Sequence, residues 1–316
     1  MKRVALALGL TLALALVLVL ALALVGWPAS TRHASPSPRG HVTTLAALEA
    51  LIDAPGPLTA TTVVGADWSV DRAGVIDLSD PRAIEAGLVP GMEPIQVYMH
   101  VIEHPTLGTY LIDTGVEHAL TADPDHAAVR GLVASLGHLD AMHVHDDTST
   151  YLADHHLTVS AVLLTHLHLD HVSGLADVPS GVPVVLGAGD LEGRNAFDLL
   201  TQPSIDRALE GHPLEEWSFG ADPDAVIDVL GDGSLWVLPA EGHTHGSVAF
   251  VARTRQGPIL YVGDASHTAW GWDHDVPPGD FTEDHDGNVA TLARLRALAA
   301  RHPGIRVRLG HQPMSH

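Results

Sequence analysis

The sequence contains no cysteine, which limits the chemistry of any metal site that it builds. Disulfide bonds and thiolate ligands are both excluded, so a bound metal ion must be held by nitrogen and oxygen atoms. Histidine, in contrast, occurs 23 times among the 316 residues and supplies many nitrogen donors. Because histidines also occur at surfaces and in structural roles, each candidate ligand is judged by its own position.

Basic residues are scarce, since 16 lysines and arginines stand against 38 aspartates and glutamates, for a formal net charge of -22. A protein whose main role is to bind nucleic acid needs a basic surface to neutralise phosphates. The sequence therefore predicts no nucleic-acid partner. Its 46% hydrophobic and 17% charged residues are typical of a folded globular protein rather than a disordered chain.

The N-terminus carries an apolar run, Val4 to Trp27, directly after the positively charged Met1–Arg3. The run is long enough to span a bilayer, which takes about 20 residues, and longer than the core of about 7–15 residues in a cleaved signal peptide. Residues 1–27 are therefore predicted to be a signal peptide or membrane anchor, and the length favours an uncleaved anchor.

Either form of this N-terminal segment predicts export, because Lys2 and Arg3 stay on the cytoplasmic side. The protein is then expected to be membrane-anchored and outward-facing, or secreted or periplasmic after cleavage. Residues 28–41 are rich in proline, serine and glycine and are predicted to be a flexible linker. Residues 42–316 are predicted to form one folded domain.

Strands and helices alternate along this domain. Apolar runs with β-branched residues predict strands over residues 95–104, 109–115, 158–166, 182–187, 234–240, 247–254, 258–264 and 305–311. Helices are predicted over residues 119–136, 190–210 and 288–301. Strands followed by helices, twice over, predict an α/β fold with two sheets and helices packed outside them.

Several predicted strands end in a residue that can bind a metal ion: Asp113, His166, His243, Asp264 and His311. Strand ends present side chains to the loops at one edge of a sheet, where functional sites collect. The densest group follows the strand that ends at residue 166, where "HLHLDH" contributes His166, His168, Asp170 and His171. Imidazole and carboxylate are ligands that zinc favours, so the pattern predicts a metal site.

In sequence order, these motifs resemble the metallo-β-lactamase superfamily, over residues 60–316. The resemblance rests on HxHxDH at residues 166–171, "GHTHG" around His243, "GD" at Asp264, "GH" at His311 and "DTG" at Asp113. It implies an αββα sandwich whose catalytic domain, residues 42–316, holds two zinc ions. The same nitrogen and oxygen donors also suit manganese, iron or cobalt.

The resemblance also assigns ligands. His166, His168 and His243 would hold the first ion, and Asp170, His171 and His311 the second, while Asp264 would bridge both. Asp113 would orient a ligand histidine through its ring N–H, although an aspartate in "DTG" could instead cap the next helix. Four further histidines in a polar stretch are expected at the surface: His143, His145, His155 and His156.

Within the superfamily the sequence most resembles the N-acyl homoserine lactonases. The similar stretches are "YMHVIEHPTLGTYLIDTG" and "GDASHTAWGWDHDVPPGDF", the second of which begins just before Asp264. The resemblance implies that a metal-bridging hydroxide attacks a small-molecule lactone or related ester, with Asp170 orienting the nucleophile. The family's tyrosine is replaced by His267, which could serve as the catalytic donor to the carbonyl or leaving oxygen.

Two alternatives to a lactonase follow from the same residues. The dinuclear site could serve a thioesterase like glyoxalase II or a phosphodiesterase, which would need cations such as Arg194, Arg253 or Arg255 near the phosphate. The chain could also be an exported zinc-binding protein without catalysis. An open two-metal site is a poor design for a purely structural role, which makes this the weaker alternative.

Overall fold

The computed structural model describes Val17, residues 28–193 and residues 197–314. The predicted N-terminal helix therefore lies, apart from Val17, outside the described residues. Within the described ranges, no helix combines the length and the apolar character needed to cross a membrane.

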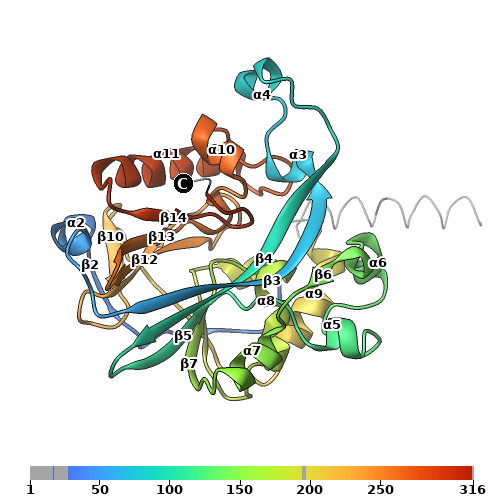
Figure 1. Ribbon diagram of the computed structural model, residues 1–316, viewed down its shortest axis with the longest axis horizontal. Helices are drawn as coiled ribbons and strands as arrows, with labels where there is room; N and C mark the ends of the chain where they lie inside the picture. The colour runs from blue at the N-terminus through green and yellow to red at the C-terminus, as the bar shows by residue number, and fades with distance from the viewer. Residues whose placement is uncertain (1–16, 18–27, 194–196, 315–316) are drawn as a thin grey trace, which may run out of the picture.

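Two β-sheets form the centre of the molecule (Figure 1). The larger sheet has the order β1 (Ser35–Pro36), β9 (Leu214–Glu216), β8 (Val184–Leu186), β7 (Val159–Leu163), β5 (Gly108–Ile112), β4 (Met92–His104), β3 (Thr59–Asp71) and β6 (His143–Val144). The smaller sheet has the order β14 (Arg306–Arg308), β13 (Gly257–Tyr261), β12 (Val248–Thr254), β11 (Leu235–Pro239), β10 (Ala225–Asp228) and β2 (His41–Thr44).

The two sheets pack face to face, because alternate residues of each strand point to opposite faces. In β4, Ile102 joins the core between the sheets, where it packs with residues such as Phe250 of β12. Its neighbour Val101 belongs instead to the cluster on the outer face of the larger sheet. Strands with apolar residues on both faces must be covered on both sides, which requires helices outside each sheet.

Helices cover both outer faces (Figure 1). The cluster outside the larger sheet includes residues of α7 (Thr148–Asp154), α8 (Leu169–Val172) and α9 (Asp198–Ala208). The cluster outside the smaller sheet includes residues of α2 (Leu45–Ile52), α10 (Ala269–His274) and α11 (His285–Arg301). The predicted arrangement of two sheets between layers of helices is therefore confirmed.

Shorter elements connect these layers. They are α3 (Arg72–Val75), α4 (Pro81–Glu85), α5 (Ala119–Ala122) and α6 (Leu132–Leu136), with 3-10 turns at Leu139–Ala141, Ser173–Asp177, Asp190–Glu192 and Gly263–Ala265. The prediction of one continuous helix over residues 119–136 was wrong. The chain leaves α5 before Pro124 and passes through Gly131 at a φ of 66°, so that only α5 and α6 are helical in this range. The helix predicted over residues 190–210 is similarly reduced to the turn at Asp190–Glu192 and α9.

Residues 28–41, predicted from composition to be a flexible linker, lie along the edges of both sheets in the structure. Ser35–Pro36 pairs in parallel with β9, and His41 begins an edge strand that pairs with β10. Ala29 and Ser30 are buried against the domain. The segment therefore packs on the domain as part of it.

Candidate metal centre

The seven predicted ligands lie at one edge of the sandwich. His166 follows β7, and the next three lie on α8 or at its start: His168, Asp170 and His171. His243 lies in the loop between β11 and β12, Asp264 in the turn after β13, and His311 just after β14. Because these strands end at the same edge, residues far apart in sequence meet there.

The Asp264 carboxylate lies at the centre of this cluster. Its Oδ2 atom lies close to the Nε2 atoms of four predicted ligands: His166 at 3.6 Å, His171 at 3.4 Å, His243 at 3.4 Å and His311 at 3.3 Å. Asp264 is 4% exposed, and the four histidines are each at most 3% exposed. The carboxylate is therefore placed to contact groups on both sides of the site.

The ligand atoms fall into two sets. In one, the donor atoms of His166, His168, His243 and Asp264 all lie within 4.8 Å of one another. In the other, those of Asp170, His171 and His311 do so, with His311 Nε2 3.2 Å from Asp170 Oδ2. The structure thus brings together the two sets that the sequence predicted, with Asp264 close to both.

Hydrogen bonds at the Nδ1 atoms of His311 and His171 orient these rings so that their Nε2 atoms face the cluster. His311 Nδ1 lies 2.8 Å from the Gln96 carbonyl oxygen, which can only accept, so Nδ1 carries the proton. His171 Nδ1 lies 2.8 Å from Asp113 Oδ2 in the same way. In both rings Nε2 is then left with the lone pair that a metal ion needs.

Several buried atoms in the cluster have no hydrogen-bond partner among the described residues: His166 Nε2, His171 Nε2 and Asp264 Oδ1. A buried polar atom without a partner is costly, by about 1–3 kcal/mol. Nitrogen and oxygen atoms gathered in one buried cluster without hydrogen-bond partners are an arrangement that a divalent metal ion can complete. The residues present therefore fit a divalent metal.

Asp113 supports the predicted ligand His171 on the side of its Nδ1 atom. It adopts a left-handed backbone conformation, with a φ of 53°, which is strained for a residue other than glycine. Its carboxylate accepts bonds from the Thr165 backbone N–H at 2.8 Å and from the Thr165 hydroxyl, in addition to the contact with His171. These bonds hold the strained aspartate in place and fix the His171 ring.

We expect Asp113→Asn to weaken metal binding by about 10- to 100-fold, the usual effect of losing such a supporting carboxylate. The asparagine amide would turn an N–H donor toward either Thr165 or His171, both of which donate to Asp113. Metal affinity measured by titration with a chelating dye checks this. Asp232→Asn is the matched control, because Asp232 pairs with His104 at 3.0 Å in a more exposed position.

Glycine is required beside Asp264 on the last strand. A Cβ atom on Gly310 would lie only 1.9 Å from Asp264 Oδ1, so any side chain there displaces the carboxylate. Gly263, just before Asp264, has a φ of 52°, and a Cβ there would lie 2.9 Å from Cβ of Thr165. The glycines of "GD" and "GH" thus permit the close approach that places Asp264 at the centre.

Gly310→Ala is therefore expected to lower metal content and affinity by about 10- to 100-fold, comparable to the loss of an outer support of a metal site. Gly304→Ala is the matched control, since a Cβ at Gly304 meets no atom within 4 Å. Both variants should be folded by circular dichroism. Equal metal content in the two would contradict the proposed crowding at Asp264.

Burial and neighbouring charge divide the histidines into two kinds. Burial lowers the pKa of His166 and His243 well below the ordinary value, and that of His168 to about 4. Burial also acts on His171 and His311, but nearby carboxylates, chiefly Asp264, outweigh it and raise both pKa values. His166, His168 and His243 are thus neutral near pH 7. Metal binding to His171 and His311 should instead release protons.

The family model of the metallo-β-lactamase superfamily matches residues 92–311. The chain belongs to this superfamily. Among curated proteins it is 33% identical, over 159 residues, to N-acyl homoserine lactonase AttM of Azorhizobium caulinodans, which covers 49% of the chain and 59% of that protein. It is 25% identical to gamma-lactamase FDB1 of Fusarium pseudograminearum over 217 residues. This aligned region covers 63% of the chain and 52% of that protein. The chain thus spans somewhat more than half the length of these relatives.

Solved structures of superfamily members share the fold. One is described as a quorum-quenching N-acyl homoserine lactone lactonase and has a TM-score of 0.58 and 16% identity, covering 82% of this chain and 93% of that chain. Another is AidC, described as a dizinc quorum-quenching lactonase, with a TM-score of 0.55 and 14% identity over 83% of this chain and 90% of that chain. At such identities the likeness establishes the fold.

His267, predicted as a catalytic donor, lies inside the cluster. Its Nε2 atom is 3.0 Å from Asp264 Oδ2, and its ring stacks on that of His311 with centroids 5.4 Å apart. The side chain is 2% exposed, and its donor atom lies within 4.8 Å of those of Asp264 and His311. The residue therefore contacts the central carboxylate itself, a closer position than the sequence alone indicated.

The remaining sequence candidates lie away from the cluster or outside the described residues. All four histidines of the polar stretch are exposed, as predicted: His143, His145, His155 and His156. Arg253 donates to the carbonyls of Ala54 and Gly233 and so serves the packing of the smaller sheet. Arg255 is exposed in the turn between β12 and β13, and Arg194 lies outside the described residues.

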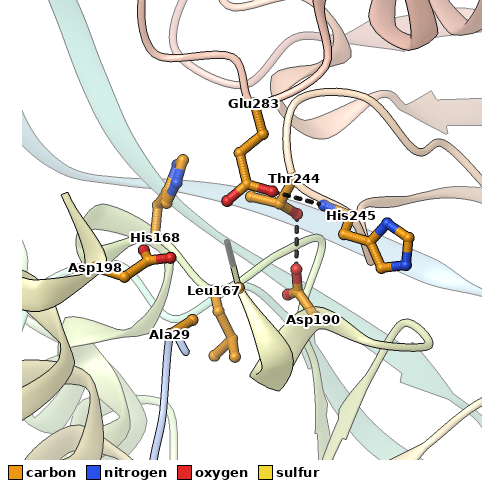
Figure 2. Close-up of a pocket in the computed structure, with 9 residues that line it drawn as sticks. Ala29, Leu167, His168, Asp190, Asp198, Thr244, His245 and Glu283 are labelled. Carbon is orange, nitrogen blue, oxygen red and sulfur yellow. Dashed lines mark hydrogen bonds between the residues drawn. The ribbon is translucent and has the colours of Figure 1, made fainter. Parts of the chain in front are cut away.

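A pocket opens beside the predicted ligand His168 (Figure 2). Its described lining is Ala29, Leu167, His168, Asp190, Gly193, Asp198, Thr244, His245 and Glu283. Asp190 Oδ1 accepts a 2.7 Å bond from the Thr244 hydroxyl, next to His243, which links the pocket wall to the ligand loop. Sequence reasoning did not predict Asp190, because a single aspartate after β8 belongs to no local motif.

Burial raises the pKa of Asp190 from 3.8 to about 7, against the lowering effect of the Thr244 hydrogen bond. The unfolded chain then ionises first, so the free energy of unfolding should fall as pH rises from about 4 to about 7. Asp190→Asn should lose this part of the pH dependence, which is worth a few kcal/mol at about 1.4 kcal/mol per pKa unit. Urea unfolding across this range checks it, with the exposed Asp154→Asn as control.

Proposed function

We propose that the protein is a metal-dependent hydrolase that opens the lactone ring of N-acyl homoserine lactones or closely related esters. The observation that carries the proposal is the central Asp264, whose Oδ2 lies within 3.6 Å of imidazole nitrogens from four predicted ligands, which come from three separate segments of the chain. The AttM relatives, named as N-acyl homoserine lactonases, support the choice of substrate.

Two divalent ions, most simply zinc, would be held by the two sets of ligands. His166, His168 and His243 would bind one ion and Asp170, His171 and His311 the other, with Asp264 shared between them. Such a pair supplies Lewis acidity and lowers the pKa of a bound water to near 7. Manganese, iron or cobalt would be compatible with the same donor atoms.

The chain's own residues would orient the reacting groups and move a proton. Asp170 Oδ2, 3.2 Å from His311 Nε2, faces the cluster and would position the attacking group. His267 Nε2 lies beside Asp264 Oδ2, so a proton held at this atom is within reach of a carbonyl or leaving oxygen bound there. Histidine as a residue type releases a proton more readily than the tyrosine of related lactonases.

The test is ring opening of N-acyl homoserine lactones of several chain lengths by the zinc-loaded protein, with a metal-stripped sample beside it. Metal-dependent opening supports the proposal. Hydrolysis of a thioester or a phosphodiester in preference to every lactone would reassign the same site to the alternative activity. Bound zinc with no turnover of any of these substrates would contradict a hydrolytic role.

We further propose that the protein is exported and held at a membrane by the apolar run Val4 to Trp27. The support is the length of this run, which is sufficient to span a bilayer, and the positive charge before it. Fractionation of cells should place the full chain with the membranes, resistant to extraction by salt and released by detergent. Recovery with the soluble fraction at its full mass would contradict anchoring.

A further inference from the structure

In the first turns of α9, polar side chains face the domain and apolar side chains face outward, the reverse of the usual pattern for a surface helix. Polar residues of this helix face the domain and are buried: Asp198, Thr201, Gln202 and Ser204. Apolar residues face outward, with Leu199 44% and Leu200 39% exposed, and Phe197, just before the helix, 55% exposed. A helix at a water-facing surface has the opposite pattern, so this face of α9 is suited to an apolar environment.

A second helix extends the same apolar surface. Leu132 and Leu136, one turn apart on α6, are 63% and 58% exposed. Helices α6 and α9 contact each other, and Figure 1 places both on the side of the molecule opposite α2. We call the surface formed by these two leucines together with Phe197, Leu199 and Leu200 the α6–α9 apolar face.

The N-terminal segment reaches the domain beside this face. Gln202, on the buried side of α9, donates a 2.6 Å bond to the carbonyl oxygen of Pro28. The next residue, Ala29, is 6% exposed, and the Thr31 hydroxyl donates to Asp206 at 2.7 Å. Pro28 follows directly on Trp27, where the apolar run Val4–Trp27 ends. No free spacer therefore separates the end of the run from α9.

We propose that the α6–α9 apolar face rests on a lipid bilayer, in an inference that depends on the proposed membrane anchoring. Consecutive Cα atoms are about 3.8 Å apart, so a chain leaving the bilayer at Trp27 holds Pro28, and Gln202 with it, at the membrane surface. The exposed leucines of the same helix must then lie at that surface. Two independent features, the attachment point and the reversed polarity of α9, indicate the same side of the molecule.

Apolar contact, rather than charge, would hold this face to the lipid. The formal net charge of -22 gives the protein as a whole no attraction for anionic head groups. Leucine and phenylalanine side chains instead enter the boundary between head groups and acyl chains, to a depth of about 5–10 Å for surface-lying helices. The bilayer therefore fits this surface better than an acidic or a basic partner protein would.

The same orientation places the pocket beside His168 next to the lipid. Ala29 and Asp198 both line that pocket, and each is the immediate neighbour of a residue at the membrane side, Pro28 and Leu199. A substrate with a polar ring and an acyl tail partitions into the head-group region. A substrate held in the head-group region would then lie beside this pocket.

Single spin labels test the orientation in the full chain, reconstituted in vesicles of phosphatidylethanolamine and phosphatidylglycerol. The chain has no cysteine, so Leu199→Cys and Leu132→Cys each carry the label at one position only. Leu51→Cys and Val42→Cys are matched controls, since these apolar residues are 39% and 52% exposed on α2 and β2, at the other side of the molecule. Electron paramagnetic resonance then compares accessibility to oxygen and to a water-soluble nickel chelate.

Labels on the α6–α9 apolar face should be several-fold more accessible to oxygen relative to nickel than the control labels. Equal accessibility at all four positions overturns the proposal. So does spin–spin broadening confined to residues 132 and 199, which would assign the face to a second copy of the chain. Failure of the protein to float with the vesicles overturns the anchoring on which the proposal rests, whereas lactonase activity is measured independently of any of these results.

Discussion

Replacing Asp264 with asparagine is expected to reduce lactone hydrolysis by at least about a thousandfold and to leave less than the full complement of bound metal. The Asp264 carboxylate lies close to both ligand sets, and its negative charge offsets the surrounding imidazoles. The imidazoles, in turn, hold the pKa of Asp264 well below its usual range against the effect of burial. An amide lacks this charge, and even one donor in a polar active site is worth about 100- to 1,000-fold.

Two measurements separate loss of metal from loss of folding. Metal content per chain should fall in Asp264→Asn, and added zinc should raise the melting temperature of the variant less than that of the unchanged protein, because binding to the folded state is what stabilises it. Asp273→Asn, an exposed aspartate on α10, is the control and should retain both activity and metal. Full activity in Asp264→Asn would remove the shared carboxylate from the mechanism.

Part of the site could be predicted from the sequence because His166, Asp264 and His311 each follow a predicted strand. β7, β13 and β14 each end three residues before a predicted ligand, and parallel or neighbouring strands deliver their ends to the same edge. Spacing in the sequence therefore translated directly into proximity. The position of His267 against Asp264 was not predictable at this level, since it depends on the turn Gly263–Ala265.

The strand β3 shows why part of the fold was missed. Its register with β4 shifts between Val64 and Ala66, so the alternation of inward and outward residues changes phase in the middle of the strand. A bulge of this kind breaks the two-residue period on which strand prediction depends. The resulting stretch, Thr59–Asp71, matched neither a strand nor a helix over its length.

Residues 28–41 could not be placed for a different reason, which is that their partners are distant in the sequence. Ser35 pairs with Glu215, and His41 pairs with Asp228. A short edge strand contributes few apolar residues of its own, so composition alone indicates a linker. Asp190 is a similar case, because its contact with Thr244 is defined only once β8 and the loop after β11 have been brought together.

Replacing His267 with alanine should lower kcat for lactone opening by about 100- to 10,000-fold, the usual contribution of a positioned proton donor, while both metal ions remain bound. Its Nε2 contacts the central carboxylate at 3.0 Å, although the sequence resemblance assigns it no place among the seven ligands. A donor that acts only in the transition state affects kcat and kcat/KM together and leaves KM largely unchanged.

His267→Tyr is the informative companion, because it restores the hydroxyl that related lactonases carry at this position. A proton donor of either kind should support catalysis, so this variant should recover much of the activity lost in the alanine variant, with its pH dependence moved to higher pH because tyrosine releases its proton less readily. Loss of metal from His267→Ala would instead make His267 a ligand or a support for Asp264. Recovery by tyrosine with metal content unchanged would support the donor role, because both side chains can carry the proton that is transferred.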